Sequence, residues 1–190
     1  NTKSDSEVLL NDFAHALQET ASKELEIENI FKAVDSLHDR VKGADAVIIM
    51  ILGYGILAFR DPNGIRPLVY GKKKDKNHMF SSESVALDCL GYSNDVRDLK
   101  PGEAVFIDKF GKMHNHYYGK SKKCTPCIFE YVYLARPDST MDEINVYNSR
   151  LSMGKYLAQK IKKELTSNEL NEIDVIVPIP DTSRTSALPI

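Results

Sequence analysis

Residues 46–70 read AVIIMILGYGILAFRDPNGIRPLVY, and this stretch indicates the fold of the first part of the chain. Its apolar runs at 46–52, 56–59 and 67–70 are short and rich in β-branched and aromatic residues, which is typical of strands. Gly53-Tyr54-Gly55 and Asp61-Pro62-Asn63-Gly64 separate the runs. Asn-Gly is a strong turn signal because both residues tolerate positive φ. The stretch therefore predicts three short strands joined by tight turns.

Helices are expected before these strands and further strands after them. Ser4-Asp5-Ser6-Glu7 has the form of a helix-capping box, and Leu9, Phe13 and Leu17 then fall on one helical stripe. Apolar residues spaced three and four apart predict a second helix over 27–41. The later pattern predicts a strand at 79–82, a short helix at 83–90, and a hairpin formed by 104–108 and 112–118. Helices followed by several strands with tight turns describe a layered α+β domain.

A change in composition at residues 119–123 (GKSKK) predicts a connector, and we place a domain boundary between residues 121 and 122. Beyond it, residues 128–134 could form a strand or a helix, and periodicity predicts a long helix over 146–165. Residues 174–179 (DVIVPI) are expected to form a strand that ends in a polar loop. A helix that leads into such a strand is how an open α/β sheet begins, and these sheets bind ligands at the carboxyl ends of their strands.

The composition excludes several classes of protein. The chain has 190 residues, of which 42% are hydrophobic and 27% charged, which is ordinary globular composition. A formal net charge of −2 provides no field that would attract nucleic acid or an anionic membrane. The longest apolar run is far shorter than the roughly 20 residues that cross a bilayer. Three cysteines in a chain of this size do not suggest a disulfide framework, so we expect a soluble protein of the reducing cytoplasm.

Three stretches carry chemistry that has both a structural and a functional interpretation. Asp5 suits the first turn of a helix, where a carboxylate meets the positive end of the helix dipole, but it could also pair with the ammonium group of an amino acid. Residues 59–68 fit a salt-bridged hairpin with solvated charges or a site for a ligand carboxylate. Residues 175–184 fit an ordinary strand and turn, or a loop whose hydroxyls and amides receive phosphate and share a magnesium shell.

Other motifs favour structural roles. Ser81-Ser82-Glu83-Ser84 has the pattern of a helix N-cap before an apolar run. Cys124 and Cys127 have the spacing of half a zinc site, but no second C-x-x-C supplies the remaining ligands. No serine lies in a G-x-S-x-G elbow, so the sequence does not predict a Ser-His-Asp triad.

Six of these stretches occur in the order and spacing of one family. They lie at residues 4–10, 58–68, 82–88, 101–104, 127–139 and 178–183, and they include SDSEVLL, AFRDPNGIRPL, SESVALD and CIFEYVYLARPDS. In these motifs the chain resembles the glutamine phosphoribosylpyrophosphate amidotransferases from end to end. The second and third motifs recur loosely in other glutaminases with an N-terminal nucleophile, whereas the block from Phe129 to Ser139 is the specific signal.

The resemblance implies an enzyme with two sites. A glutaminase domain of N-terminal-nucleophile type, with αββα layers, releases ammonia from glutamine. A type I phosphoribosyltransferase domain uses that ammonia to convert phosphoribosylpyrophosphate to 5-phosphoribosylamine, the first step of de novo purine biosynthesis. On this mapping residues 1–121 are the later part of the glutaminase and residues 122–190 begin the transferase. Purine nucleotides as feedback inhibitors and a homo-oligomeric state are further expectations.

The resemblance also assigns roles to individual residues. Asp5 matches the aspartate that holds the amino group of glutamine, and Asp181, Thr182 and Ser183 match the first phosphoribosyltransferase loop near magnesium pyrophosphate. Thr182 is thus a candidate magnesium ligand. Cys127 lies where some members bind an iron–sulfur cluster, but others keep a cysteine there without one, so no cluster is predicted.

The departures from the family pattern concern both reaction centres. The family nucleophile is a processed N-terminal cysteine, whereas residue 1 is Asn1 and all three cysteines follow the SDSE motif. The Asp-Asp phosphoribosylpyrophosphate loop is also absent. We expect these 190 residues to be a central part of the enzyme and inactive alone. Two alternatives remain: a non-catalytic paralogue, and another glutaminase-linked synthase, against which the strand and Asp-Thr-Ser loop argue.

Overall fold

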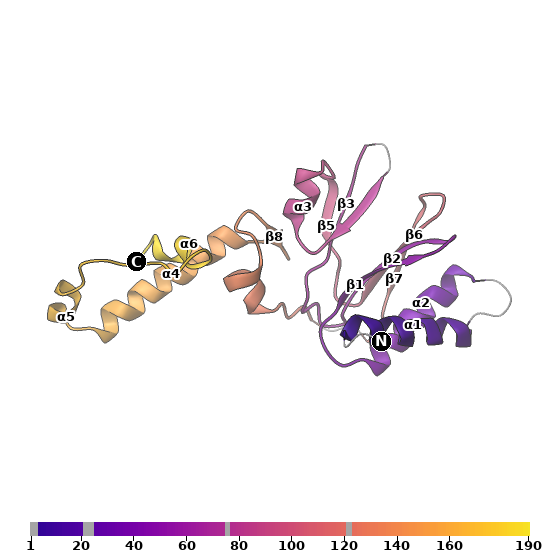
Figure 1. The fold of residues 1–190 in the computed structure, drawn as a ribbon, viewed down its shortest axis with the longest axis horizontal. Coiled ribbons are helices and arrows are strands. Elements are labelled where there is room, and N and C mark those ends of the chain that lie inside the picture. The colour runs from indigo at the N-terminus through magenta and orange to yellow at the C-terminus, as the bar shows by residue number, and fades with distance from the viewer. Residues whose placement is uncertain (1–3, 21–24, 75–76, 121–122) are drawn as a thin grey trace. The chain divides into compact units, whose positions relative to one another are not determined.

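The computed structural model describes residues 4–20, 25–74, 77–120 and 123–190. Its Cα packing divides the chain into two units (Figure 1). The first unit comprises Asn1–Ser82 and Leu87–Pro126, and the second comprises Glu83–Ala86 and Cys127–Ile190. The predicted domain boundary falls on residues 121 and 122, which lie outside the described residues, and it stays a prediction. Among the described residues, no helix combines the length and apolar character needed to cross a membrane.

The first unit is built on an antiparallel sheet with strand order β1-β2-β6-β7. The strands are β1 (Ala46–Ile51), β2 (Gly55–Arg60), β6 (Glu103–Asp108) and β7 (Met113–Tyr117). One face is covered by the helices α1 (Asp5–Thr20) and α2 (Ile27–Arg40), which lie beside the sheet in Figure 1. These six elements confirm the predicted helices and strands to within a few residues at their ends.

The middle residues of the central strands β2 and β6, at 57–59 and 104–107, are apolar because both faces of the sheet are buried there. Leu57, Phe59 and Phe106 point toward the helices and pack with Phe13 and Leu37. Ala58, Val105 and Ile107 point the other way and belong to a second core cluster, which joins this sheet to the neighbouring one. The other buried members of that cluster are Leu68, Tyr70 and Leu99. Because successive side chains of a strand point to opposite faces, each of these two strands contributes residues to both cores.

A second antiparallel sheet has the order β4-β3-β5, with β3 (Val69–Lys72), β4 (His78–Ser81) and β5 (Asn94–Asp98). Its strand β5 was not predicted, because the sequence NDVRD lacks the apolar alternation of a strand. A short helix, α3 (Ser84–Cys89), follows β4. Its Leu87 is fully buried, and a methyl group added at Gly71 of β3 would lie 3.0 Å from the Leu87 Cδ1 atom.

The second unit is organised around α4 (Val146–Glu164), which confirms the predicted long helix. Residues 128–134, predicted as strand or helix, contain the π-helix η1 (Glu130–Leu134). The small core of this unit consists of Tyr131, Ala135, Met141 and Val146, with Met153 against it. A short two-stranded ribbon and two short helices complete the described part of the unit: β8 (Thr140–Met141) with β9 (Ile144–Asn145), α5 (Ser167–Asn171) and α6 (Ser183–Ala187).

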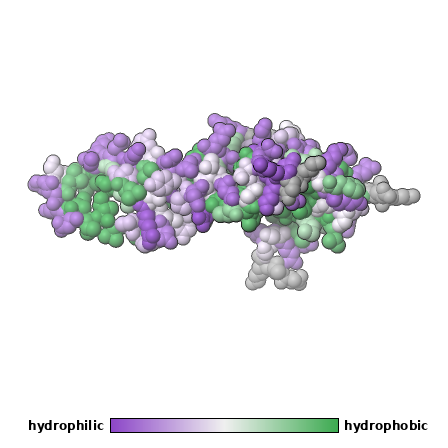
Figure 2. Space-filling view, turned by 90° about the horizontal axis from the view of Figure 1, so that it is seen from above, coloured by the Kyte–Doolittle hydropathy of each residue, from purple (hydrophilic) through white to green (hydrophobic). Residues whose placement is uncertain are grey.

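The strand predicted at residues 174–179 is wrong, since these residues are not assigned to any strand. A strand requires hydrogen bonds to a neighbouring strand, and within the described residues no other strand pairs with this segment. Its side chains are exposed accordingly, with Val175, Val177 and Ile179 at 71%, 73% and 79%. Figure 2 shows apolar residues gathered on the surface of this unit, at the left of the view.

The carboxyl group of Asp45, just before β1, should make the stability of the first unit depend on pH. Burial, and then the negative charge of Asp61, raise the pKa of Asp45 to about 6. Its Oδ1 atom is buried, and no described residue forms a hydrogen bond with it. Because the pKa in the folded state exceeds the ordinary aspartate pKa of 3.8, the stability contributed by protonated Asp45 is complete below pH 3.8 and is lost as pH rises through about 6.

We therefore expect Asp45→Asn to stabilise the protein above pH 7, by at most about 3 kcal/mol, since one pKa unit corresponds to about 1.4 kcal/mol. Thermal unfolding of both proteins between pH 4 and pH 8 measures this effect, and the difference should shrink toward pH 4. The backbone carbonyl of Asp45, which accepts from the Asp61 amide at 2.9 Å, is unchanged by the substitution. A variant that is less stable at pH 8 would contradict the prediction.

Candidate functional site

Asp5 is the first residue of α1 and its side chain is exposed. The capping oxygen belongs to Ser4, whose hydroxyl accepts from the Ser6 amide at 3.3 Å, while the Glu7 amide donates to the Ser4 carbonyl at 3.1 Å. The predicted N-terminal cap therefore exists, and Ser4 supplies it. The Asp5 carboxylate remains exposed to solvent at the positive end of the helix dipole, where it can meet a ligand.

The loop from Arg60 to Arg66 differs from the predicted hairpin with solvated charges. Arg60 and Asp61 are each only 1% exposed. The Arg60 guanidinium donates to the carbonyls of Arg66 at 2.7 Å, Leu99 at 2.7 Å and Gly64 at 2.8 Å. The Asp61 carboxylate accepts from the amides of Asn63, Ile65 and Arg66 at 2.9, 2.8 and 3.1 Å. Both side chains are thus buried and hydrogen-bond to backbone carbonyl or amide groups.

The predicted turn at Asn63-Gly64 is confirmed by Gly64, which has a φ of 62°. A side chain there would be strained, and its Cβ would lie 2.9 Å from Cγ of Pro101 and 3.1 Å from Sγ of Cys124. Within the described residues, neither Cys124 nor Cys127 forms a disulfide. Among the described residues, no group of three or more His, Cys, Asp or Glu side chains is arranged to hold a metal ion.

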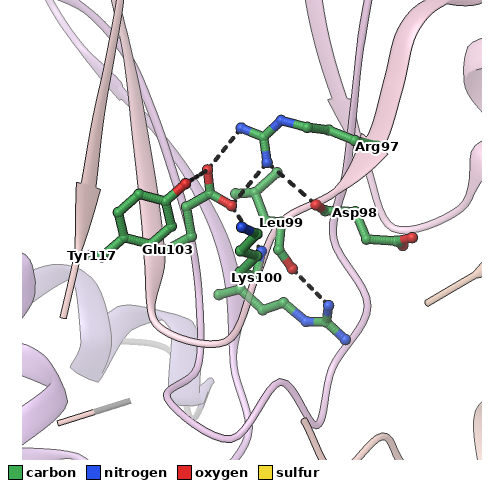
Figure 3. Close-up of polar contacts among 7 residues, drawn as sticks. Arg97, Asp98, Leu99, Lys100, Glu103 and Tyr117 are labelled. Carbon is green, nitrogen blue, oxygen red and sulfur yellow. Dashed lines mark hydrogen bonds and ion pairs between the residues drawn. The ribbon is translucent and has the colours of Figure 1, made fainter. Parts of the chain in front are cut away.

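A second buried charge joins the two sheets of the first unit (Figure 3). Arg97 of β5 makes a bidentate pair with Glu103 of β6, at 2.8 and 2.7 Å. The Glu103 carboxylate also accepts from the Lys100 amide at 2.8 Å and from the Tyr117 hydroxyl at 3.3 Å, and its side chain is fully buried. The hydrogen bonds that Arg97 donates to the Glu103 carboxylate raise the pKa of Arg97. This network holds the two sheets together, and we assign it a structural role.

The three predicted phosphate-binding residues form one turn in the second unit. Asp181 is exposed and pairs with Arg184 at 3.1 Å, whereas Thr182 and Ser183 are half-buried. The Ser183 hydroxyl donates to the Ile179 carbonyl. Carboxylate and hydroxyl oxygens beside an arginine are groups that bind phosphate and magnesium. The structure thus brings Asp181, Thr182 and Ser183 together, while Asp5 belongs to the first unit.

The position of this turn depends on the packing of α6 against α4. Gly154 of α4 is buried against α6, and an added Cβ atom would overlap the Ser186 carbonyl and lie 2.7 Å from Cγ of Pro189. Thr185 of α6 is 9% exposed. Close contact between the two helices therefore requires a glycine at position 154, and α6 begins at Ser183.

Sequence reasoning missed a buried polar network in the second unit. The Glu83 carboxylate accepts from the Arg136 amide at 2.8 Å and from the Ser139 hydroxyl at 2.6 Å. Arg150, which is 2% exposed, donates to the carbonyls of Tyr131 at 2.8 Å and Ala135 at 2.7 Å. The motifs SES and ARPDS each stand out in the sequence, but Glu83 and Ser139 are 56 residues apart, so no local pattern indicates that they touch.

The chain that carries these motifs is similar in sequence to known proteins. No family model matches the chain. It is 54% identical to the amidophosphoribosyltransferase of Pseudomonas aeruginosa over 191 residues, which cover 99% of this chain and 37% of that protein. The amidophosphoribosyltransferase of Escherichia coli is 48% identical over 194 residues, which cover 100% of this chain and 38% of that protein. The chain therefore spans a little over a third of the length of these curated relatives.

A solved structure supports the same assignment. The glutamine phosphoribosylpyrophosphate amidotransferase from B. subtilis, in complex with ADP and GMP, superimposes with a TM-score of 0.74 at 32% identity. The match covers 100% of this chain and 37% of that one. Agreement of sequence and α+β structure over nearly the whole chain leads to one conclusion. Across the residues described, the chain belongs to the amidophosphoribosyltransferase family.

Proposed function

We propose that the protein to which these residues belong converts phosphoribosylpyrophosphate and glutamine to 5-phosphoribosylamine, the first step of purine biosynthesis, in the cytoplasm. The observation that carries the proposal is 54% identity over 99% of the chain to an amidophosphoribosyltransferase. The paralogue and the alternative synthase have no comparable observation in their favour. The B. subtilis relative was solved with ADP and GMP, which supports purine nucleotides as regulators here. A homo-oligomeric assembly belongs to the same proposal.

In this proposal the first unit is the later part of an N-terminal-nucleophile glutaminase, and the second unit begins a type I phosphoribosyltransferase. The pair α1 and α2, two stacked antiparallel sheets, and the end of α3 packed on β3 support an αββα arrangement. Asp5 would bind the ammonium group of glutamine, since its carboxylate is exposed and Ser4 already caps the helix. Ammonia released there would be used in the transferase.

The turn at residues 181–183 is proposed to bind the pyrophosphate group. The Thr182 hydroxyl can donate to a phosphate oxygen, the Ser183 hydroxyl can do so after releasing the Ile179 carbonyl, and the exposed Arg184 adds positive charge. The available donors are hard oxygens, which suit Mg²⁺, and Thr182 with Asp181 would hold that ion. Bound magnesium would neutralise negative charge on the pyrophosphate leaving group. The proposed function of these residues in the reaction is thus to hold the pyrophosphate leaving group in one orientation.

Two substitutions in the natural polypeptide test the proposal. We expect Asp5→Asn to lower kcat/KM for glutamine by about 10- to 100-fold, because a hydrogen bond to a charged group contributes about 1.5–3 kcal/mol. Activity with free ammonia should be retained. Thr182→Val should lower activity with either nitrogen donor and raise KM for phosphoribosylpyrophosphate. Steady-state assays of phosphoribosylamine formation measure all of these.

Ser4→Ala is the matched control for Asp5→Asn, because it removes the helix cap and keeps the carboxylate. If Ser4→Ala and Asp5→Asn have the same effect on glutamine use, Asp5 acts through helix stability and its proposed binding role is wrong. A natural polypeptide that forms no phosphoribosylamine from glutamine or ammonia would overturn the proposed function. Residues 1–190 expressed alone are expected to form no product.

A further inference from the structure

His38, in the last turn of α2, is a buried histidine that packs against the segment following β7. Its ring is 8% exposed and contacts two aromatic rings, with centroid distances of 5.6 Å to Phe59 and 5.2 Å to Tyr118. Its Nε2 atom is buried, and no described residue forms a hydrogen bond with it. A neutral imidazole can leave Nε2 without a proton, whereas an imidazolium carries a proton on both ring nitrogens. Charging His38 in place would therefore bury a donor without an acceptor among the described residues.

The segment that covers His38 is attached to the same turn of α2. The Tyr118 hydroxyl donates to the Asp39 carboxylate at 2.6 Å, and the Lys120 ammonium group donates to the same carboxylate. Because Tyr118 is itself only 7% exposed, its ring contact with His38 excludes water from that side of the imidazole. We call residues 118–120, with these contacts, the α2 strap. The strap and α2 both belong to the first unit.

The other charged groups around His38 come from three elements. Asp35 and Asp39 lie on α2, Asp61 follows β2, and His116 lies on β7. Burial lowers the pKa of His38, the negative charges of the three carboxylates oppose that effect only in part, and His116 adds to it. A proton on Nε2 of His116 meets the Asp35 carboxylate at 2.9 Å, so that ring, unlike His38, has an acceptor.

The direction of the pH effect follows from the lowered pKa of His38. Neutral His38 contributes its full stability above the ordinary histidine pKa of 6.5, and this contribution is lost as pH falls through the pKa of the folded protein. Asp39 does not cause the loss, since hydrogen bonds from Lys120 and Tyr118 lower its pKa below 3.8 and keep it ionised at pH 5. Asp45 acts in the opposite direction, because its raised pKa of about 6 makes its protonation stabilising.

We propose that protonation of His38 releases the α2 strap, which makes the strap an acid-sensitive contact within the first unit. A charged ring needs water or an acceptor at Nε2, and one of its two aromatic neighbours must move to admit it. Phe59 is fully buried in the core, whereas the strap is held to α2 by a half-exposed carboxylate. The strap is therefore the side that opens. This device involves the first unit alone and is independent of the proposed enzymatic activity.

The test measures hydrogen exchange of the natural polypeptide at pH 7 and pH 5. The Tyr118 amide donates to the Gly102 carbonyl at 2.9 Å and reports on the strap, while the Leu99 amide donates to the Leu68 carbonyl at 2.8 Å and reports on the core. We expect the protection factor of Tyr118 to fall by about 3- to 25-fold at pH 5. The upper limit is that of a ring with the ordinary pKa of 6.5 that binds no proton while buried.

Protection at Leu99 should be the same at both pH values. Equal losses at Leu99 and Tyr118 would show general unfolding of the unit and overturn the proposal. An unchanged protection factor at Tyr118 would show that acid does not release the strap, and would overturn it as well.

Two substitutions remove the titrating group. His38→Phe keeps an aromatic ring against Phe59 and Tyr118, and His38→Gln keeps a polar side chain, so the test does not depend on one variant folding well. In both, the protection factor of Tyr118 should be the same at pH 5 and pH 7. A loss as large as that of the unmodified protein would mean that another group is responsible, and it would refute the role of His38.

Two further variants serve as controls. His15→Gln replaces an exposed histidine of the same unit, which pairs with Glu19 at 3.4 Å, and it should keep the full pH response of Tyr118. Asp39→Ala removes the carboxylate that holds the strap, so it should lower the protection of Tyr118 at pH 7 already. Unchanged protection in Asp39→Ala would mean that the strap is not held to α2 in solution, and the proposal would be wrong.

Discussion

Arg60→Met is expected to lower the free energy of unfolding of the first unit by about 3 to 5 kcal/mol, because it removes a buried cation from three carbonyl groups. The side chain of Arg60 is 1% exposed and reaches the carbonyls of Gly64, Arg66 and Leu99. Methionine has similar length and no donor, so it leaves these acceptors buried without their partner. Urea unfolding followed by circular dichroism should show a midpoint lowered by about 2 M, for an m-value of about 2 kcal/mol/M.

Arg66→Met is the control in the same loop. The Arg66 side chain is exposed, while its backbone carbonyl and amide hydrogen-bond to Arg60 and Asp61. We expect it to change stability by no more than about 0.5 kcal/mol, as for other surface substitutions. Arg60→Lys should resemble Arg60→Met more than wild type, because an ammonium group lacks the planar fork that reaches three carbonyls. Equal stability of the Arg60 and Arg66 variants would contradict the prediction.

The second large effect is expected from Gly154→Ala, which should remove α6 from its place on α4. Alanine is normally favoured over glycine in a helix by about 1 kcal/mol, so any loss of stability must come from tertiary contact. Here the added Cβ atom would overlap the carbonyl of Ser186 and crowd the ring of Pro189. Overpacking of this kind costs about 1–3 kcal/mol, and backbone cannot move aside as a flexible side chain can.

The functional consequence of Gly154→Ala follows from the position of α6. This helix begins at Ser183 and continues the turn that contains Asp181 and Thr182. If the turn binds pyrophosphate as proposed, its displacement should raise KM for phosphoribosylpyrophosphate and lower ammonia-dependent activity by at least about tenfold, since small misplacements of binding groups have large effects on rate. The melting temperature should fall as well. Glutamine hydrolysis without the second substrate should be retained.

Ser152→Ala serves as the control for this experiment. Ser152 is exposed on the same helix, and its hydroxyl donates to the Asn148 carbonyl at 2.9 Å. This variant should keep both the melting temperature and the affinity for phosphoribosylpyrophosphate. A Gly154→Ala protein with wild-type melting temperature would contradict the packing argument. If Gly154→Ala lowers the melting temperature as expected but leaves KM for phosphoribosylpyrophosphate unchanged, the assignment of residues 181–183 as a phosphate site would be contradicted.

Local patterns in the sequence determined the main elements of this protein. The spacing of apolar residues defined α2 and α4, the apolar runs defined β1, β2 and β6, and Asn63-Gly64 marked a turn. These features depend on interactions between residues close in sequence, so their signals are local. Resemblance to the family identified Asp5 and residues 181–183, and their binding roles stay predictions.

Tertiary structure alone decided the features that depend on distant residues. Arg60 is buried because the carbonyl of Leu99, 39 residues away, accepts its hydrogen bond, whereas local charge pattern suggested a solvated side chain. The apolar segment 174–179 forms no strand because a strand needs a paired neighbour, whatever its own propensity. The contact of Glu83 with Ser139 joins residues 56 apart. Each of these depends on which groups the fold brings together, and no periodicity in the sequence records that.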